Sequence, residues 1–69
     1  MPLLKMDAGA RRRIKEVVGN DALRHRLGTL GFVEGMEVEV VAKVGGNVVV
    51  GVLGSRVAVD RTVARCILV

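Results

Sequence analysis

The sequence predicts a mainly β domain, a small barrel of about five short strands with one short α-helix. Valine gives the first indication, because 12 of the 15 valines follow residue 36 and β-branched side chains favour strands. Glycines at 45, 46, 51 and 54 interrupt this valine-rich half, which is typical of tight turns between short strands. Leucines spaced by four and three before residue 31 indicate the helix. The 69 residues are therefore expected to form one domain, residues 1–69.

The first part of the chain is expected to contain a lead-in loop, a strand and the start of the helix. One proline and one glycine place residues 1–10 in a loop, and partial alternation predicts a strand at residues 12–18. Gly19 or Asn20 can cap the helix that follows, and Asp21 in its first turn suits the positive end of the helix dipole.

The helix is expected to present one leucine face to the barrel. Leu23, Leu27 and Leu30 recur at spacings that align on one side of a helix, so they should fix it in place. Gly31 follows the last leucine, where a glycine in the left-handed conformation can end a helix. Gly35 is interpreted as a further turn glycine.

The segment 36–44 is the clearest strand candidate. Apolar and mostly polar side chains alternate along it, so one face should be buried and the other should meet water. The expected faces are Met36, Val38, Val40, Ala42 and Val44 on the buried side, and Glu37, Glu39, Val41 and Lys43 on the other.

The rest of the chain is expected to supply the remaining strands. Residues 48–53 and 56–59 form two of them, each preceded by a glycine turn. Asp60 or Thr62 can cap one helical turn, and residues 66–69 form a closing strand.

Charge and hydropathy narrow the class of protein. The net charge is +4 and the isoelectric point is about 10.2, which suits nucleic acid, an anionic membrane surface or an acidic protein face. No apolar run approaches the roughly 20 residues that span a bilayer. The N-terminus lacks the pattern of a signal peptide, so a cytoplasmic location is expected.

No residue is expected to catalyse a reaction, hold a cofactor or bind a metal. His25 is the only histidine and Cys66 the only cysteine, so neither a metal-site spacing nor an internal disulfide is possible from these residue types alone. Cys66 lies in an apolar run, which is typical of a buried structural thiol. Glu37 and Glu39 share a strand face, but a pair of carboxylates is a weak metal signal and is interpreted as a solvated face.

Two basic clusters are the candidate partner-binding residues. They are Arg11, Arg12 and Arg13 at the start of the first strand, and Arg24, His25 and Arg26 on the helix. Either cluster could meet an acidic protein face or phosphate. One phenylalanine and no tyrosine or tryptophan argue against binding of single-stranded nucleic acid, which stacks bases on aromatic rings.

One stretch has the form of a family motif, Arg26-Leu27-x-x-Leu30-Gly31-x-Val33-x-Gly35. Further matching positions are Gly9, Ile14, Leu23, Val38, Val40, Gly54, Val57-Ala58-Val59, Ala64, Ile67 and Val69. With these residues the chain resembles the ferrous iron transport protein A family, FeoA, over nearly its whole length.

The resemblance implies a small SH3-like β-barrel with a helix laid against it. It also implies a cytoplasmic accessory protein that regulates or assembles FeoB, the membrane ferrous iron transporter with a G-protein domain. The same module is similar to the C-terminal domain of some iron- or manganese-dependent repressors.

Taken together, these features favour a non-enzymatic binding module that docks on the cytoplasmic part of FeoB, with the two basic clusters as contacts. Such a protein would not span the membrane, although its partner could hold it at the inner membrane. Two alternatives stay open, a small basic barrel that binds nucleic acid and a repressor-type module that binds a peptide. The strand at 48–53 is apolar on both sides, so a homo-oligomer also stays open.

Overall fold

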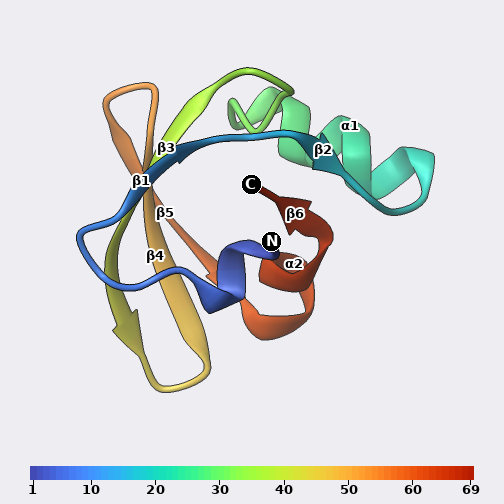
Figure 1. The fold of residues 1–69 in the computed structure, drawn as a ribbon. Helices are drawn as coiled ribbons and strands as arrows, with labels where there is room; N and C mark the ends of the chain where they lie inside the picture. The colour runs from blue at the N-terminus through green and yellow to red at the C-terminus, as the bar shows by residue number, and fades with distance from the viewer.

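The structure is a computed structural model that describes residues 1–69. Its elements follow one another around a central core (Figure 1). In chain order they are the 3₁₀ turn η1 (Leu3–Lys5), β1 (Arg11–Arg13), β2 (Glu16–Val17), α1 (Asp21–Thr29), β3 (Glu37–Val44), β4 (Asn47–Val52), β5 (Ser55–Asp60), α2 (Arg61–Cys66) and β6 (Ile67–Leu68).

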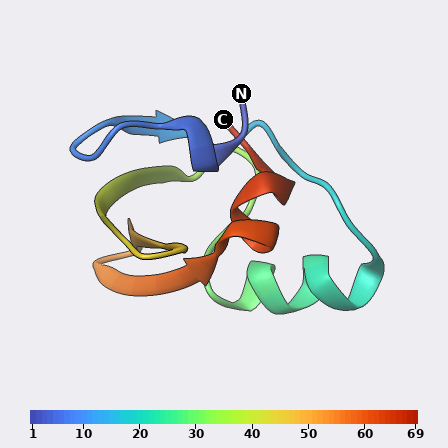
Figure 2. The ribbon, with the colours of Figure 1, turned by 90° about the horizontal axis from the view of Figure 1, so that it is seen from below.

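Six strands form two antiparallel sheets. The larger sheet has the order β1-β3-β4-β5, and the smaller one pairs β2 with β6. The larger sheet makes one curved wall, and α2 and β6 lie across the core from it (Figures 1 and 2). The predicted mainly β fold is confirmed, with six strands in place of about five, but the two sheets do not close into one continuous barrel, because β5 has a strand partner on one side only. The helical turn expected after Asp60 is a second short helix, α2.

Fourteen apolar side chains form one buried cluster, and no polar or charged residue is buried. Leu3 and Met6 belong to this cluster and are almost completely covered. The expectation of a plain lead-in loop at residues 1–10 is therefore wrong for its first half. These two buried apolar side chains anchor the N-terminal segment in the core, because removal of apolar surface from water is favourable.

The strand predicted at residues 12–18 is two strands that belong to different sheets. The N–H of Ile14 donates to the carbonyl of Met36, whereas the N–H of Lys15 donates to the carbonyl of Leu68. The backbone thus changes partners between these two residues. Ile14 lies where the chain passes from one sheet to the other, and its buried side chain anchors this point in the core.

Both ends of α1 follow the local signals in the sequence. The side chain of Asn20 accepts a hydrogen bond from the N–H of Leu23 at 2.8 Å. At the other end Gly31 has φ of 102°, its N–H donates to the carbonyl of Gly28, and the following N–H donates to the carbonyl of Leu27. These bonds form a Schellman motif, which ends the helix where the glycine predicted it.

The leucine face of α1 is narrower than its spacing suggests. Leu27 is buried and Leu23 is half-buried, but Leu30 is 42% exposed. The expectation that all three leucines fix the helix is therefore wrong for Leu30. The reason is its place as the C-cap, where the chain leaves the helix and turns into the loop.

A β-bulge reverses the predicted faces in the second half of β3. The register between β3 and β4 shifts between Val40 and Ala42, so Val41 is an extra residue in the strand. Val38 and Val40 are buried as predicted, whereas Ala42 is half-buried and Val44 is 63% exposed. One extra residue moves every later side chain to the opposite face, so the predicted alternation is wrong after Val40.

The β4–β5 hairpin has a two-residue turn at Leu53 and Gly54. Both residues have positive φ, 51° and 76°, as in a type I′ turn. Asp60 ends β5 and caps α2, because its Oδ1 accepts a hydrogen bond from the N–H of Val63 at 2.8 Å. Cys66, expected in the closing strand, is the last residue of α2. The closing strand β6 therefore begins one residue later than expected, at Ile67.

Candidate partner-binding surface

The three arginines of β1 are all exposed but differ in their contacts. Nη2 of Arg11 lies 3.7 Å from Oε1 of Glu39, and Nη1 of Arg13 donates to the carbonyl of Gly35 at 2.9 Å. Arg12 makes no hydrogen bond or ion pair with another side chain of the protein. Arg12 is therefore the member of this cluster whose guanidinium is free to contact a partner.

Arg24, His25 and Arg26 are exposed on α1. Successive helical residues are rotated by about 100° around the axis, so the three side chains leave the helix in different directions. Arg24 lines a hollow beside the helix, and the other two do not. Of the three, Arg24 is placed best to act together with neighbouring apolar surface.

The two basic clusters do not form one patch. In two perpendicular views, β1 and α1 lie on opposite sides of the molecule (Figures 1 and 2). A partner that contacts α1 therefore meets the arginines of β1 only if it reaches around the barrel. The six residues proposed from the sequence must be considered as two separate surfaces.

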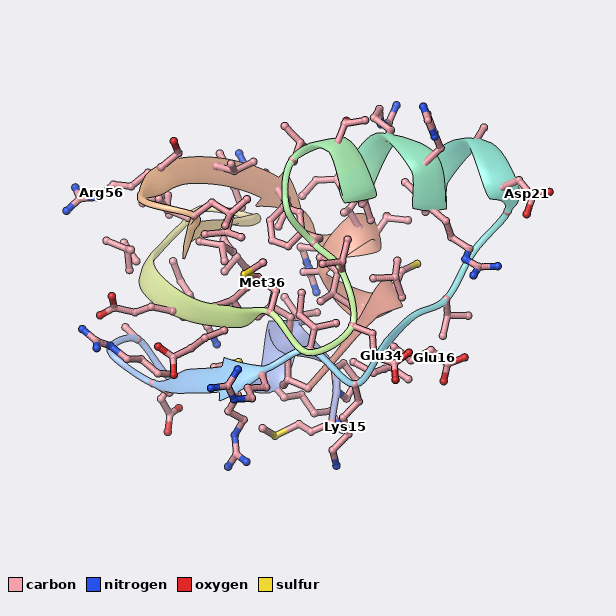
Figure 3. The ribbon with its side chains drawn as sticks, turned by 90° about the horizontal axis from the view of Figure 1, so that it is seen from above. Lys15, Glu16, Asp21, Glu34, Met36 and Arg56 are labelled. Atoms are coloured by element: carbon pink, nitrogen blue, oxygen red, sulfur yellow. The ribbon has the colours of Figure 1, made fainter.

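The hollow beside α1 lies between the helix, β2 and the loop after the helix, and its volume is about 230 Å³. Its lining combines three apolar side chains with three charged ones, namely Val17, Phe32, Val33, Arg24, Glu16 and Glu34. Figure 3 shows Glu16 and Glu34 close to one another on this side of the molecule. A lining that mixes apolar side chains with charges of both signs is compatible with contact to another protein.

Exposed apolar residues next to this hollow were not predicted from the sequence. Val33 is 43% exposed and Leu30 is 42% exposed, and both lie where α1 ends. Val33 belongs to the motif that carries the family resemblance, but its place in a turn gave no sign of which way it points. The signal in the sequence that could have indicated its exposure is that Val33 lies between two turn glycines, Gly31 and Gly35.

The remaining reactive side chains are scattered. His25 is exposed on α1, and Cys66 is half-buried with its thiol donating to the carbonyl of Thr62 at 3.4 Å. No group of three or more His, Cys, Asp and Glu side chains is arranged to hold a metal ion. None of the helices has the length and apolar character needed to cross a membrane.

Comparison with known proteins identifies the family. The family model of the FeoA domain matches residues 1–69. No curated protein sequence matches the chain significantly.

Two solved FeoA structures share both fold and sequence with the chain. FeoA of Stenotrophomonas maltophilia, solved with zinc, is 32% identical with a TM-score of 0.86 over 99% of this chain and 87% of that one. It is described as a prokaryotic SH3 domain protein and a candidate activating factor for ferrous iron transport. FeoA of Chlorobium tepidum is 30% identical with a TM-score of 0.89 over 97% of this chain and 66% of that one.

A manganese-dependent transcriptional repressor shares the fold alone. It is 14% identical with a TM-score of 0.87, and the match covers 97% of this chain and 39% of the repressor. The SH3-like architecture is thus common to both groups of proteins, while sequence separates them. On the family model and the two FeoA relatives, the chain belongs to the FeoA family, whose members are small proteins associated with ferrous iron transport.

Proposed function

We propose that this protein is a cytoplasmic accessory protein of ferrous iron uptake that acts by docking on the G-protein region of the transporter FeoB. The observation that carries the proposal is the match of the FeoA family model to the whole chain. The role is regulatory and is exerted through binding, without catalysis by this chain.

The surface around the C-terminal end of α1 supports this role. Leu30 and Val33 supply exposed apolar area, and Arg24 lies at the rim of the neighbouring hollow. Apolar contacts of this kind give affinity, while rim charges fix orientation and speed association. Arg12 on the far side of the barrel is a second candidate contact.

Calorimetry with the detergent-solubilised transporter at physiological salt tests the proposal, with and without guanine nucleotide. Saturable binding is expected, and a difference between the nucleotide states would connect docking to the G-protein cycle. Absence of binding in every nucleotide state would overturn the proposed function.

Charge swaps separate the two candidate surfaces. Arg24→Glu and Arg12→Glu change the charge on α1 and on β1, and both side chains are exposed, so the fold should be kept. Lys5→Glu is the matched control, because η1 lies on the other side of the molecule from α1 (Figure 2). We expect Arg24→Glu to weaken docking by about tenfold and Lys5→Glu to leave it unchanged. Normal docking by Arg24→Glu, with circular dichroism confirming the fold, would remove α1 from the interface.

The exposed arginines of β1 and the net charge of +4 favour one second candidate, binding of nucleic acid. Attraction to phosphate alone weakens steeply as salt rises, because binding releases counterions. Titration of a DNA or RNA duplex at low and physiological salt tests this candidate. Affinity that persists at physiological salt would support it, and affinity confined to low salt would remove it.

A further inference from the structure

β5 is an open edge of the larger sheet. It pairs with β4 on one side, and no strand pairs with its other side. In the β4–β5 hairpin the pair Val52 and Ser55 closes a two-residue turn, and such a pair exchanges both backbone hydrogen bonds. Because bonded and non-bonded pairs alternate along an antiparallel ladder, the N–H and C=O groups of Arg56 and Ala58 point away from β4.

These outward groups have no partner within the chain. Neither Arg56 nor Ala58 takes part in any backbone hydrogen bond outside the regular elements or in any side-chain hydrogen bond, and both residues are exposed. Figure 3 shows the side chain of Arg56 extending away from the body of the molecule. Two donors and two acceptors therefore stand free along one six-residue strand.

The opposite edge of the sheet is protected in a way that β5 is not. β1 is three residues long and consists only of arginines. Short, charged edge strands resist pairing with other chains. β5 is twice as long and has one arginine, Arg56, with a small exposed side chain at Ala58.

The sequence of β5 is complementary to itself. When two antiparallel copies meet with Ala58 opposite Ala58, each Arg56 stands opposite Asp60 of the second copy. The three outward-facing positions thus give two opposite-charge pairs around one pair of small side chains. Opposite charges directly across an antiparallel ladder stabilise it, and a strand that pairs with its own copy gives a closed two-fold dimer.

The capping role of Asp60 is compatible with this pairing. Its Oδ1 accepts the hydrogen bond from the N–H of Val63, which leaves Oδ2 for a guanidinium. On the same outer face of the sheet, Gly51 stands opposite Arg56 and has no side chain to block it. Gly51 and Arg56 line a hollow of about 340 Å³ on this part of the surface.

We propose that the protein forms a two-fold dimer in which β5 pairs antiparallel with β5 of a second copy, centred on Ala58. The pairing joins two four-stranded sheets into one continuous sheet. It leaves α1 and the arginines of β1 outside the shared edge, so it does not depend on the function proposed above. A single shared edge is a small interface, and the dimer is therefore weak and depends on concentration.

Disulfide cross-linking tests the register. Residues in a hydrogen-bonded antiparallel pair have Cα atoms about 5.5 Å apart, within the range of a disulfide. In a Cys66→Ser background, Ala58→Cys should form a disulfide-linked dimer under mild oxidation. Ala22→Cys, an exposed alanine on α1, is the matched control and should stay monomeric. Equal cross-linking of the two variants, or none at Ala58→Cys, would overturn the proposed register.

Sedimentation velocity tests the dimer itself, at protein concentrations from about 10 µM to about 1 mM. The native chain should pass from monomer to dimer across this range. Ala58→Lys places two like charges at the centre of the interface and should raise the dissociation constant roughly fivefold or more, whereas Ala22→Lys should not change it. Circular dichroism should show that both variants are folded. A native chain that stays monomeric throughout, or a dimer that Ala58→Lys does not weaken, would overturn the proposal.

Discussion

Gly31 meets two independent demands at one position. Its φ of 102° is unfavourable for any residue with a Cβ atom. A Cβ there would also stand 2.6 Å from Cδ1 of Leu53 and 3.1 Å from Cγ2 of Val52. Gly35 has φ of 87° and no heavy atom within 4 Å of its virtual Cβ, so it meets the conformational demand alone.

Replacement of the two glycines by alanine should separate strain from collision. Gly35→Ala should lower the free energy of unfolding by about 1–2 kcal/mol through backbone strain. Gly31→Ala adds a collision in a buried site and should lower it by about 1–3 kcal/mol more. Urea denaturation of both variants measures the difference. Equal losses would show that Leu53 moves aside without cost.

Helix α1 is attached to the barrel through the buried Leu27 and the half-buried Leu23, both of which pack against the core. Leu27 is 2% exposed, whereas its exposed neighbour in the predicted face, Leu30, lies at the C-cap. The helix therefore depends on one fully buried leucine, one half-buried leucine and its two caps. Its outer surface is left free for a partner.

Truncation of these leucines should give very different results. Leu27→Ala should lower the free energy of unfolding by about 2–5 kcal/mol, because it opens a cavity in the core. Leu30→Ala should change it by less than about 1 kcal/mol and instead weaken docking on the transporter. Thermal and urea unfolding of both variants provide the comparison. A large loss at Leu30→Ala would mean that this side chain supports the fold.

The β4–β5 hairpin contains the only non-glycine residue with positive φ. Leu53 has φ of 51° and is 66% exposed, so the turn carries backbone strain with little burial in return. Asparagine followed by glycine is the preferred pair for a type I′ turn.

Leu53→Asn should therefore stabilise the hairpin. We expect a gain of about 0.5–1 kcal/mol in the free energy of unfolding, measured by urea denaturation. Ser55→Asn, in the adjacent strand position, is the control and should give no gain. Destabilisation by Leu53→Asn would show that the contact of Leu53 with the Gly31 turn outweighs the strain.

At the scale of the molecule, the two termini are joined and help to close the core. The N-terminal amine of Met1 donates to the carbonyl of Val69 at 3.0 Å, and the N–H of Val69 donates to the carbonyl of Met1 at 2.7 Å. Pro2 bridges to Leu68, and Leu3 is completely buried. The first residues therefore act as part of the barrel wall (Figure 1).

A single change near the N-terminus should affect the whole domain. Leu3→Ala should lower the free energy of unfolding by about 2–5 kcal/mol, because it removes a buried side chain from the one core. Lys5→Ala, in the same turn but exposed, should have almost no effect. Unfolding followed by circular dichroism makes the comparison. A loss below about 0.5 kcal/mol at Leu3→Ala would show that residues 1–6 are not part of the cooperative unit.

The sequence by itself determined the features that depend on neighbours in the chain. Asn20 and Gly31 set the ends of α1 because caps are local hydrogen-bond patterns, and the glycines at 45 and 54 set the hairpin turns because positive φ favours glycine. The mainly β class follows from the same kind of local pattern, whereas the family resemblance rests on the motif residues and their order along nearly the whole chain. The exposure of the candidate arginines was also predictable, because unpaired guanidinium groups are rarely buried.

Only the tertiary structure decided which distant segments meet. The burial of Leu3, the change of sheets at Ile14 and the bulge at Val41 each depend on hydrogen bonds or contacts with residues far along the chain. The same is true of the separation of the two basic clusters and of the open edge of β5. Local spacing carries no information about such pairings, because they are chosen by how the whole core packs and by which backbone groups find partners.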